Sequence, residues 1–508
     1  MTRVEGEDFV IESSRGKELK QAGARWDPRL KAWKLAATRM NWIILAELEL
    51  ANVWDDPAAR PSPPEITDER LLPHQRRAVE RLVQARHGEL KAVFPGGGKT
   101  FIAVAAADLS VPDDRVVVVA PASLLKTWEA EIRKWQRVPG DVYVVQGKLD
   151  YDRARDARWI VMSWDKMTRE ADSFGIGWPV LVLDESVLAK SRGSKRFKTL
   201  QKIRRGFARV WLLSGSPTTR YPDDLWTQLH VIWPRAFPSY WRFAERYCTV
   251  EETPWARIVT GARAGRNAAE ENSDLIDVVT EDDAGLDLPE YLFEPPVLTD
   301  MRPKQARAYR SMAKDFIAEL GDGTQVVSAN EAAKLTRLQQ IASWWDGESG
   351  KHDAVADLIR SFEPPYLIWT HWRDGAQALR DRLEDIGVDA RLVNGGTRDR
   401  DEEEWLAAFK AGTLEALVLS LGVGKFGHTF TKTRTIIGVD RTFMADDLYQ
   451  SSFRVRRIGL EHRPVWVPVV AAGTVDELTV GDNIEAKLTS ISKITRADLA
   501  SLLKGMGR

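Results

Sequence analysis

The 508 residues contain 73 lysines and arginines against 74 aspartates and glutamates, so the net charge of −1 excludes binding of a polyanion through global charge alone. A single cysteine, Cys248, excludes an intrachain disulfide and, with seven scattered histidines, argues against a closed zinc site. No apolar run reaches the roughly 18 residues of a membrane span, and the acidic first residues do not form a signal peptide, so we expect a cytoplasmic protein of two or three domains.

Residues 1–55 predict a small α+β module. Its lysines and arginines are interleaved with Trp26 and Trp33, a mixture that is typical of a surface that contacts phosphates and stacks on bases. The alternative is a small fold whose only core is the two tryptophans, with its charges in solvent. We favour nucleic-acid binding, with Arg25 and Lys31 among the contacts.

Residues 56–67 are rich in proline, which disfavours helices and strand pairing and favours an extended linker. Beyond it, apolar runs such as Val116–Ala120 alternate with helical patterns, as in parallel sheets that are covered by helices on both faces. We therefore predict an α/β fold with two doubly wound parallel sheets. The predicted parts are a first domain over 68–295 with a helical insertion over about 221–290, a helical insertion or linker over 296–365, a second domain over 366–495 and a tail over 496–508.

The sequence from Val93 to Thr100, V-F-P-G-G-G-K-T, indicates a phosphate-binding loop between a strand and a helix. Glycines let backbone N–H groups wrap a phosphate chain, the helix start and Lys99 add positive charge, and the hydroxyl of Thr100 can bind Mg²⁺. The alternative, a glycine-rich turn between core elements, is disfavoured by the strand–loop–helix context. The predicted nucleotide contacts here are Gly96, Gly97, Gly98, Lys99 and Thr100.

Two carboxylates follow the apolar run Val180–Leu183. At the end of a parallel strand, Asp184 would hold Mg²⁺ together with Thr100, and Glu185 would orient and deprotonate the attacking water. Two surface acids that cap a helix are the alternative. The segment 214–218 also follows a strand, and its hydroxyl groups can relay the phosphate state through hydrogen bonds.

Arg454 and Arg457 are three residues apart, so on a helix they would share one face. Two guanidinium groups on one face can reach a polyphosphate from the second domain and stabilise its transition state. A basic face in solvent or a patch for DNA phosphates is the alternative, and Arg456, which lies off that face, is predicted to have this role.

In this order, the motifs resemble the SWI/SNF-related branch of the superfamily-two helicases and translocases, from about Leu71 to about Leu488. The matching segments are G-G-G-K-T (96–100), D-E-S (184–186), S-G-S-P (214–217) and Q-x-x-x-R-x-x-R-I-G (450–459). The pattern R-W-D-P-x-x-K-x-W, from Arg25 to Trp33, resembles the small module before the motor in HARP-like annealing helicases. The resemblance implies two RecA-like lobes with ATP and Mg²⁺ at their interface.

The resemblance also implies roles for single residues. Gln75 would read adenine and Gly427 would contact the nucleotide. The implied DNA contacts are Pro121, Ser123, Ser163, Trp164, Thr370, His371 and Ser420. Val187 departs from the pattern, because the family has a histidine there that links the ATP site to the loop at 214–217. That link is therefore altered or supplied elsewhere.

The expected activity is a DNA-stimulated ATPase that translocates on duplex, forked or branched DNA in replication, recombination or repair, of a phage or bacterial type. Two alternatives stay open. One is a protein that binds forks or junctions and uses a slow ATPase as a switch. The other is a structure-selective nuclease that uses scattered carboxylates. The expected catalytic residues of the ATPase are Lys99, Asp184, Glu185, Arg454 and Arg457, and the candidate carboxylates of a nuclease are Asp399, Asp401 and Glu402.

Overall fold

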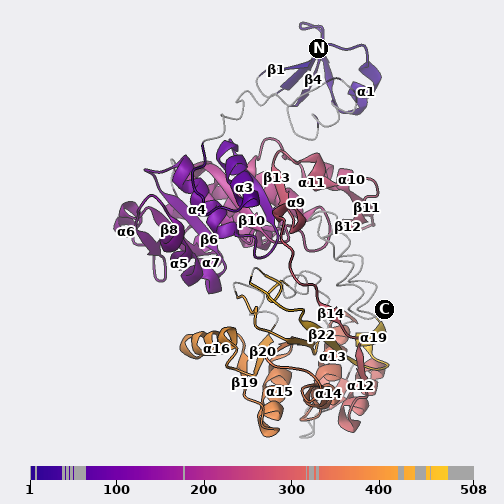
Figure 1. Ribbon diagram of the computed structural model, residues 1–508. Coiled ribbons are helices and arrows are strands. Elements are labelled where there is room, and N and C mark those ends of the chain that lie inside the picture. The colour runs from indigo at the N-terminus through magenta and orange to yellow at the C-terminus, as the bar shows by residue number, and fades with distance from the viewer. Residues whose placement is uncertain are drawn as a thin grey trace. The chain divides into compact units, whose positions relative to one another are not determined.

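The computed structural model divides into two compact units, one running to Ala284 and the other beginning at Gly285. Figure 1 shows the helices and strands of both. No helix among the described residues is both long and apolar enough to cross a membrane. The described residues are 2–5, 8–36, 41, 45, 48, 50, 65–174, 178–315, 317–319, 325–327, 331–420, 428–440, 453–457 and 459–478.

The first unit starts with four antiparallel strands, in the order β1–β2–β4–β3, and helix α1 comes between β2 and β3 in the chain. Ile11, Leu19 and Leu35 belong to the core of this module, and Trp33 packs against it. Trp26 is 49% exposed, so the two tryptophans do not form the core by themselves. The bounds are β1 (Thr2–Glu5), β2 (Asp8–Ile11), α1 (Gly16–Gln21), β3 (Arg25–Asp27) and β4 (Ala32–Ala36).

A seven-stranded parallel sheet organises the rest of the first unit, in the order β13–β5–β10–β9–β6–β8–β7. β6 is buried along its whole length and β9 from Val180 onward, as their unbroken apolar runs predict. The strands are β5 (Gly88–Val93), β6 (Val116–Ala120), β7 (Val142–Val144), β8 (Trp159–Ser163), β9 (Trp178–Asp184), β10 (Phe207–Ser214) and β13 (Ile276–Val279). The helices are α3 (Pro73–Gln84), α4 (Lys99–Ser110), α5 (Leu125–Trp135), α6 (Tyr151–Asp156), α7 (Trp164–Arg169), α8 (Lys195–Ile203), α9 (Asp224–Ile232), α10 (Tyr240–Tyr247) and α11 (Ala268–Glu271).

The predicted helical insertion at 221–290 also contains strands. The hairpin of β11 (Cys248–Glu252) and β12 (Arg257–Ala262) follows α10, and β13 joins the main sheet beside β5. Asp277 breaks the apolar pattern of β13, which hid this strand in the sequence. In the fold, the Asp277 carboxylate lies 2.8 Å from Nζ of the fully buried Lys91 and 3.3 Å from Nε of Arg81. Burial opposes the charge on Asp277, but these two cations hold its pKa below the usual value.

The second unit is built on another parallel sheet, in the order β14–β22–β21–β18–β20–β19, with β15 also paired to β22. The two doubly wound sheets confirm the predicted fold class. The strands are β14 (Leu292–Phe293), β15 (Val297–Thr299), β18 (Tyr366–Thr370), β19 (Ala390–Val393), β20 (Ala416–Ser420), β21 (Thr435–Gly438) and β22 (Val465–Ala471). The other elements are α12 (Pro303–Asp315), β16 (Ile317–Glu319), β17 (Gln325–Val327), α13 (Glu331–Ser343), α14 (Gly350–Leu358), α15 (Arg373–Asp385), α16 (Asp399–Ala411) and α19 (Val475–Leu478).

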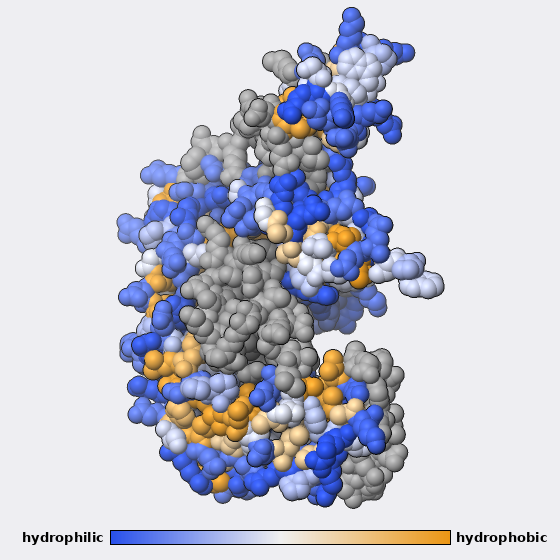
Figure 2. Space-filling model, turned by 90° about the vertical axis from the view of Figure 1, so that its right-hand side faces the viewer, coloured by the Kyte–Doolittle hydropathy of each residue, from blue (hydrophilic) through white to orange (hydrophobic). Residues whose placement is uncertain are grey.

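The second sheet starts earlier in the chain than predicted. β14 and β15 lie before residue 300 and pair with β22, although the sequence places them in the end of the first domain and in a helical linker. Strands of two or three residues are too short to show a period. The predicted tail at 496–508 lies outside the described residues. On the face drawn in Figure 2, most of the coloured surface is hydrophilic, and hydrophobic residues gather over part of the second unit.

Candidate functional site

The loop between β5 and α4 has the backbone geometry of a phosphate cradle. Gly96 and Gly98 adopt φ angles of 95° and 86°, which residues with side chains rarely adopt. A Cβ on Gly97 would lie 2.6 Å from Cγ1 of Val93, so only glycine fits there without a shift. α4 begins at Lys99, and its apolar first turns are buried, which holds the N–H groups of the helix start in place. These residues fit a bound phosphate chain.

Two residues at the start of α3 support this loop from the side. Nε2 of Gln75 donates to the carbonyl of Gly97 (3.2 Å), and its Oε1 accepts the N–H of Leu72 (3.0 Å). Nε2 of His74 lies 3.1 Å from the same carbonyl, and burial lowers the pKa of His74, so a neutral ring donates through Nε2. The structure thus places Gln75 against the phosphate loop. Its contact with adenine stays a prediction.

Three predicted motifs meet at one edge of the first sheet. β10 lies between β5 and β9, and all three strands run parallel. Leu213 pairs with Asp184 on one side, and Ser214 pairs with Ala92 on the other. Because the carboxyl ends of parallel strands share an edge, the phosphate loop, the acidic pair and the segment after Ser214 are neighbours.

Asp184 ends β9 and is held by donors on both carboxylate oxygens. The indole N–H of Trp128 donates to its Oδ2 (2.8 Å), and the backbone N–H of Glu185 donates to its Oδ1 (3.0 Å). A carboxylate has about four acceptor sites, so these bonds fix Asp184 and leave it able to act as a metal ligand. A carboxylate and a hydroxyl are hard oxygen donors of the kind that Mg²⁺ prefers, and the joint binding of Mg²⁺ by Asp184 and Thr100 stays a prediction. Glu185 is also buried and turns the chain out of the strand with φ 48°.

The predicted DNA contacts of the first unit include one clear error. The side chain of Trp164 is only 2% exposed, and its indole N–H donates to the backbone carbonyl of Asp184 (3.0 Å). The prediction that Trp164 contacts DNA is therefore wrong for its side chain, because the fold uses it to brace the acidic pair. Ser123 is exposed after β6, Pro121 is buried, and the hydroxyl of Ser163 caps α7.

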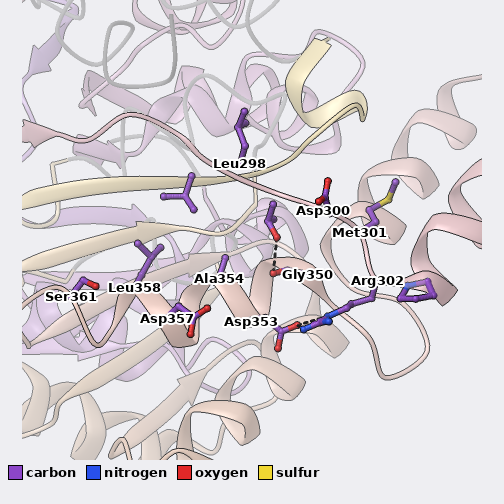
Figure 3. Close-up of a pocket in the computed structure, with 13 residues that line it drawn as sticks. Leu298, Asp300, Met301, Arg302, Gly350, Asp353, Ala354, Asp357, Leu358 and Ser361 are labelled. Carbon is purple, nitrogen blue, oxygen red and sulfur yellow. Dashed lines mark hydrogen bonds and ion pairs between the residues drawn. The ribbon is translucent and has the colours of Figure 1, made fainter.

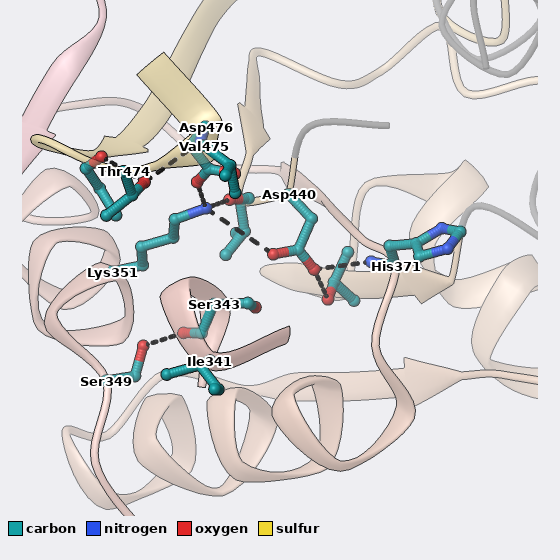
Figure 4. Close-up of polar contacts among 12 residues, drawn as sticks. Ile341, Ser343, Ser349, Lys351, His371, Asp440, Thr474, Val475 and Asp476 are labelled. Carbon is teal, nitrogen blue, oxygen red and sulfur yellow. Dashed lines mark hydrogen bonds and ion pairs between the residues drawn. The ribbon is translucent and has the colours of Figure 1, made fainter. Parts of the chain in front are cut away.

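The end of β18 meets a buried ion network in the second unit (Figure 4). The hydroxyl of Thr370 and the backbone N–H of His371 both donate to Oδ2 of Asp440 (2.7 Å each). Nζ of Lys351 lies 3.9 Å from Oδ1 of Asp440 and also pairs with Asp476. The predicted DNA contact of Thr370 is thus wrong for its side chain, which is buried and bonded to Asp440, whereas the His371 side chain is exposed.

Sequence reasoning missed the ionised residues of this network. Asp440 comes two residues after the end of the apolar strand β21, so the pattern that pointed to Asp184 could also have found it. Lys351 lies in α14 and Asp476 in α19, and neither was assigned a role from the sequence. Burial opposes the charge on Asp440, yet Lys351 and the hydrogen-bond donors hold its pKa below the usual value. The network ties together the carboxyl ends of β18, β21 and β22.

Ser420 is the remaining predicted DNA contact of the second unit. It is partly exposed and ends β20, where it pairs with Thr370 across the sheet. Ser420 therefore lies at the same sheet edge as His371, and both stay predicted contacts.

Arg454 and Arg457 lie in a turn and not on the predicted helix face. The carbonyl of Arg454 accepts the N–H of Phe430 (2.8 Å), which ties the turn to another segment. Nη1 of Arg454 donates to the carbonyl of His428 (3.4 Å), and Nη1 of Arg457 donates to Oγ1 of Thr429 (2.6 Å). The two guanidinium groups still come together, but through long-range contacts with one three-residue segment and not through helical spacing.

Arg456 has different neighbours from the other two arginines. It donates to the backbone carbonyls of Leu288 (3.4 Å) and Pro289 (3.3 Å). Arg456 is therefore used within the fold of the second unit, and not on the solvated face or DNA patch that was predicted. The predicted nucleotide contact Gly427 lies outside the described residues.

Two histidines, the buried His352 and the partly buried His428, are expected to make the second unit sensitive to acid. Burial lowers the pKa of His352 to about 4, and burial together with Lys410 and Arg454 lowers that of His428 to about 4. In the unfolded chain these histidines take up protons near pH 6.5, but in the folded chain only near pH 4. Between these two pH values the unfolded chain binds more protons than the folded chain, so the free energy of unfolding decreases as the pH is lowered. We expect a loss of roughly 2 kcal/mol for each histidine between about pH 7.5 and pH 5, measured by hydrogen exchange in α14 and at 428–430.

Substitutions in the full chain separate this effect from general acid denaturation. His352→Asn removes one titrating group, so the loss in α14 should shrink by about half. His371→Asn changes an exposed side chain and should leave the loss unchanged. The same pH dependence in His352→Asn as in the unsubstituted chain would contradict the prediction.

Arg25 and Lys31 are exposed in the N-terminal module. Arg25 starts β3, which also carries the exposed Trp26, and Lys31 lies in the turn that follows. Oδ1 of Asp27 accepts the N–H of Arg29 (2.9 Å) and so holds this turn. Two cations and an indole are thus accessible in one short segment, which is compatible with the predicted nucleic-acid contact.

A cavity of about 580 Å³ lies between β15 and α14 in the second unit (Figure 3). Arg302 pairs with Asp353 at its wall (2.6 Å), and Thr299 bonds to the carbonyl of Gly350 (3.0 Å). None of the predicted site residues lines this cavity. In the described parts of the chain, no three His, Cys, Asp or Glu side chains are grouped as metal ligands.

Known proteins are similar to this chain over most of its length. The "SWI/SNF-related matrix-associated actin-dependent regulator of chromatin subfamily A-like protein 1" of Bos taurus is 25% identical over 429 residues, 80% of this chain and 43% of that protein. The "DNA annealing helicase and endonuclease ZRANB3" of Homo sapiens is 23% identical over 432 residues, 81% of this chain and 39% of that protein. The chain thus spans about two fifths of the length of these relatives.

A solved structure and two family models also match. The "Sulfolobus solfataricus SWI2/SNF2 ATPase core in complex with dsDNA" matches with a TM-score of 0.40 and 21% identity, over 84% of this chain and 96% of that chain. The Helicase conserved C-terminal domain matches residues 350–459. The SNF2-related domain matches residues 22–342, which is more than half of the chain. The protein therefore belongs to the SNF2-related family.

Proposed function

We propose that the protein hydrolyses ATP with Mg²⁺ and uses the energy to translocate on duplex, forked or branched DNA, which it remodels in replication, recombination or repair. The observation that carries the proposal is the meeting of the phosphate loop, the acidic pair and the segment 214–217 at one sheet edge. Family membership supports DNA as the polymer, since one relative is named a DNA annealing helicase.

In this proposal each residue of the first unit has one task. The N–H groups at the start of α4 and the ammonium group of Lys99 bind the β and γ phosphates, and Gln75 contacts adenine. Thr100 and Asp184 hold Mg²⁺, which when bound neutralises charge on the phosphate oxygens. Glu185 orients the attacking water and takes its proton onto the carboxylate.

Arg454 and Arg457 would complete the site from the second unit, and their approach to the phosphates is part of the proposal. The positive charges that lie close to these two arginines support this part of the proposal. Burial, followed by the charge of Arg457, lowers the pKa of Lys410 on α16. A polyphosphate would relieve this repulsion and bind two guanidinium groups at once.

DNA would be held through its phosphates. Ser123 and Ser163 in the first unit and His371 and Ser420 in the second are the proposed contacts, and each lies at the end of a strand or just after it, at the carboxyl edge of its sheet. If ATP binding and hydrolysis move the two units against each other, the contacts of the first unit and those of the second would bind the DNA phosphates alternately. The protein would then advance along one DNA strand. Contacts of this kind read no sequence, so binding should be salt-sensitive and independent of sequence.

The test compares ATP hydrolysis with single-stranded, duplex, forked and four-way DNA. We expect the rate to rise with duplex or branched DNA. In Arg25→Ala/Lys31→Ala, the DNA concentration for half-maximal stimulation should rise, and the slope of log affinity against log salt should fall by about two, while the maximal rate stays the same.

The matched control replaces two exposed cations outside the N-terminal module. Lys148→Ala/Arg155→Ala should leave both the half-maximal DNA concentration and the salt slope unchanged. Full turnover without DNA, or none with any DNA, would instead favour a junction-binding protein with a slow ATPase switch. Cleavage of a labelled fork in Mg²⁺ or Mn²⁺ would favour a nuclease.

A further inference from the structure

A buried chain of hydrogen bonds connects the acidic pair with the loop after β10. Oγ of Ser186, the residue after Glu185, donates to Oε1 of Gln228 on α9 (2.7 Å). Nε2 of Gln228 donates to the carbonyl of Pro217 in the loop (2.6 Å) and to that of Asp224 at the start of α9 (3.2 Å). One carboxamide therefore joins the turn after Glu185 to the loop after β10 and to the start of its own helix.

The carboxamide of Gln228 has one orientation that satisfies all of these groups. The two carbonyl oxygens only accept, so the NH₂ group must face them, and Oε1 must face the hydroxyl of Ser186. Ser186 and Gln228 are each 1% exposed, so water cannot take over these bonds. The relative position of the three segments thus depends on this side chain.

A second contact runs beside the first. Lys190, which follows the 3₁₀ turn Ser186–Ala189, donates to Oγ1 of Thr219, and the N–H of Thr219 donates to Oδ2 of Asp224 (2.8 Å). Val187 lies between Ser186 and Lys190 in the sequence. Its side chain is buried and has no polar atom that could add a third connection. Both connections end at Asp224. Hydrogen bonds made by side chains therefore join the start of α9, the loop after β10 and the turn after Glu185.

We propose that Gln228 is a positioning residue that carries the state of the ATP site to the loop 214–217 and to α9, and so couples hydrolysis to the DNA response. This inference rests on the proposed function. Ser186 follows Glu185 directly, so a change of the backbone at Glu185 displaces the Ser186 hydroxyl. The bonds of Gln228 then shift Pro217 and Asp224 together, whereas Gln228 itself does not touch ATP or the water.

Gln228→Leu tests the proposal in the full chain, because leucine fills a similar volume and makes none of the three bonds. The ratio of ATP hydrolysis rates with and without duplex DNA should fall at least about tenfold, while the rate without DNA stays within about twofold of that of the unsubstituted chain. Ser186→Ala should lower the same ratio, and the double variant should be no worse than Gln228→Leu alone, since both act on one link.

Thr227→Val is the matched control. Thr227 is the neighbour of Gln228 on α9 and is equally buried, but its hydroxyl bonds only to the carbonyl of Asp224 in its own helix (3.4 Å). The DNA stimulation ratio of this variant should be that of the unsubstituted chain. Thermal melting of each variant shows whether a change in rate follows a loss of folded protein.

A second readout keeps the inference separate from the proposed function. Adding ADP with beryllium fluoride should change hydrogen exchange at 214–219 in the unsubstituted chain, and Gln228→Leu should lose this response while that at 184–186 remains. If DNA does not stimulate the unsubstituted chain, the proposed function fails, and the exchange result still decides whether the link exists. The inference would be overturned if folded Gln228→Leu kept both the DNA stimulation and the exchange response. It would also be overturned if the ATP hydrolysis rates with and without DNA fell equally and in step with the melting temperature.

Discussion

Glu185→Gln is expected to lower ATP hydrolysis by about a hundred- to ten-thousandfold while ATP and DNA binding survive. Glutamine has the size of glutamate, so it fits the same buried position at the end of β9. Its amide cannot take a proton from the attacking water, which is one of the two roles that the proposal gives to this carboxylate. The measurement is the steady-state rate with saturating duplex DNA, together with the affinity for a fluorescent ATP analogue and for DNA.

Two further variants are compared with Glu185→Gln. Lys99→Ala should also abolish hydrolysis with DNA binding intact, but it should weaken ATP binding, because it removes a charge from the phosphate loop. Glu271→Gln breaks an ion pair with Arg246 (2.6 Å) in the same unit and should leave the rate unchanged. Full hydrolysis by purified, folded Glu185→Gln would refute the assignment.

Arg457→Lys is expected to reduce hydrolysis by about a thousandfold or more while ATP affinity changes little. Lysine keeps the charge but loses the planar fork of donors that can bind phosphate oxygens and Thr429 together. The loss should therefore appear in the maximal rate. A stopped-flow comparison of nucleotide binding with single-turnover hydrolysis separates the two steps.

The neighbouring arginines make this test specific. Arg456→Lys should keep the maximal rate, because Arg456 donates to backbone carbonyls within the second unit. Arg454 is 3% exposed, so its substitution should lower stability as well as rate, and Arg457 is the cleaner position. A normal rate in Arg457→Lys would remove this residue from the transition state and leave Arg454 as the candidate.

Contiguous stretches of sequence were sufficient for the nucleotide site of the first unit. The phosphate loop needs glycines, a lysine and a hydroxyl within a few residues, and the acidic pair directly follows an apolar strand. Parallel strand order then brings the two motifs to one edge, as any doubly wound sheet does. The predicted strand–loop–helix around residues 93–100 and the predicted strand end at Asp184 are therefore confirmed.

Predictions failed where a polar residue or a short element hides the pattern. β13 was missed because Asp277 interrupts it, and Lys91 and Arg81, from other parts of the chain, compensate that charge. The helix face of Arg454 and Arg457 was wrong because backbone bonding to Phe430 outweighs local helical spacing. In both cases the deciding partner is distant in the sequence.

The sequence by itself determined which chemistry the protein carries: the phosphate loop, the acidic pair and the two α/β sheets follow from residues that are close together in the chain. Only the tertiary structure decided what surrounds them. Trp164 braces Asp184, Thr370 bonds to Asp440, and Gln228 joins three segments. The physical reason is that a buried polar group must find a partner wherever the fold provides one, and the choice of that partner is not written in the spacing of neighbouring residues.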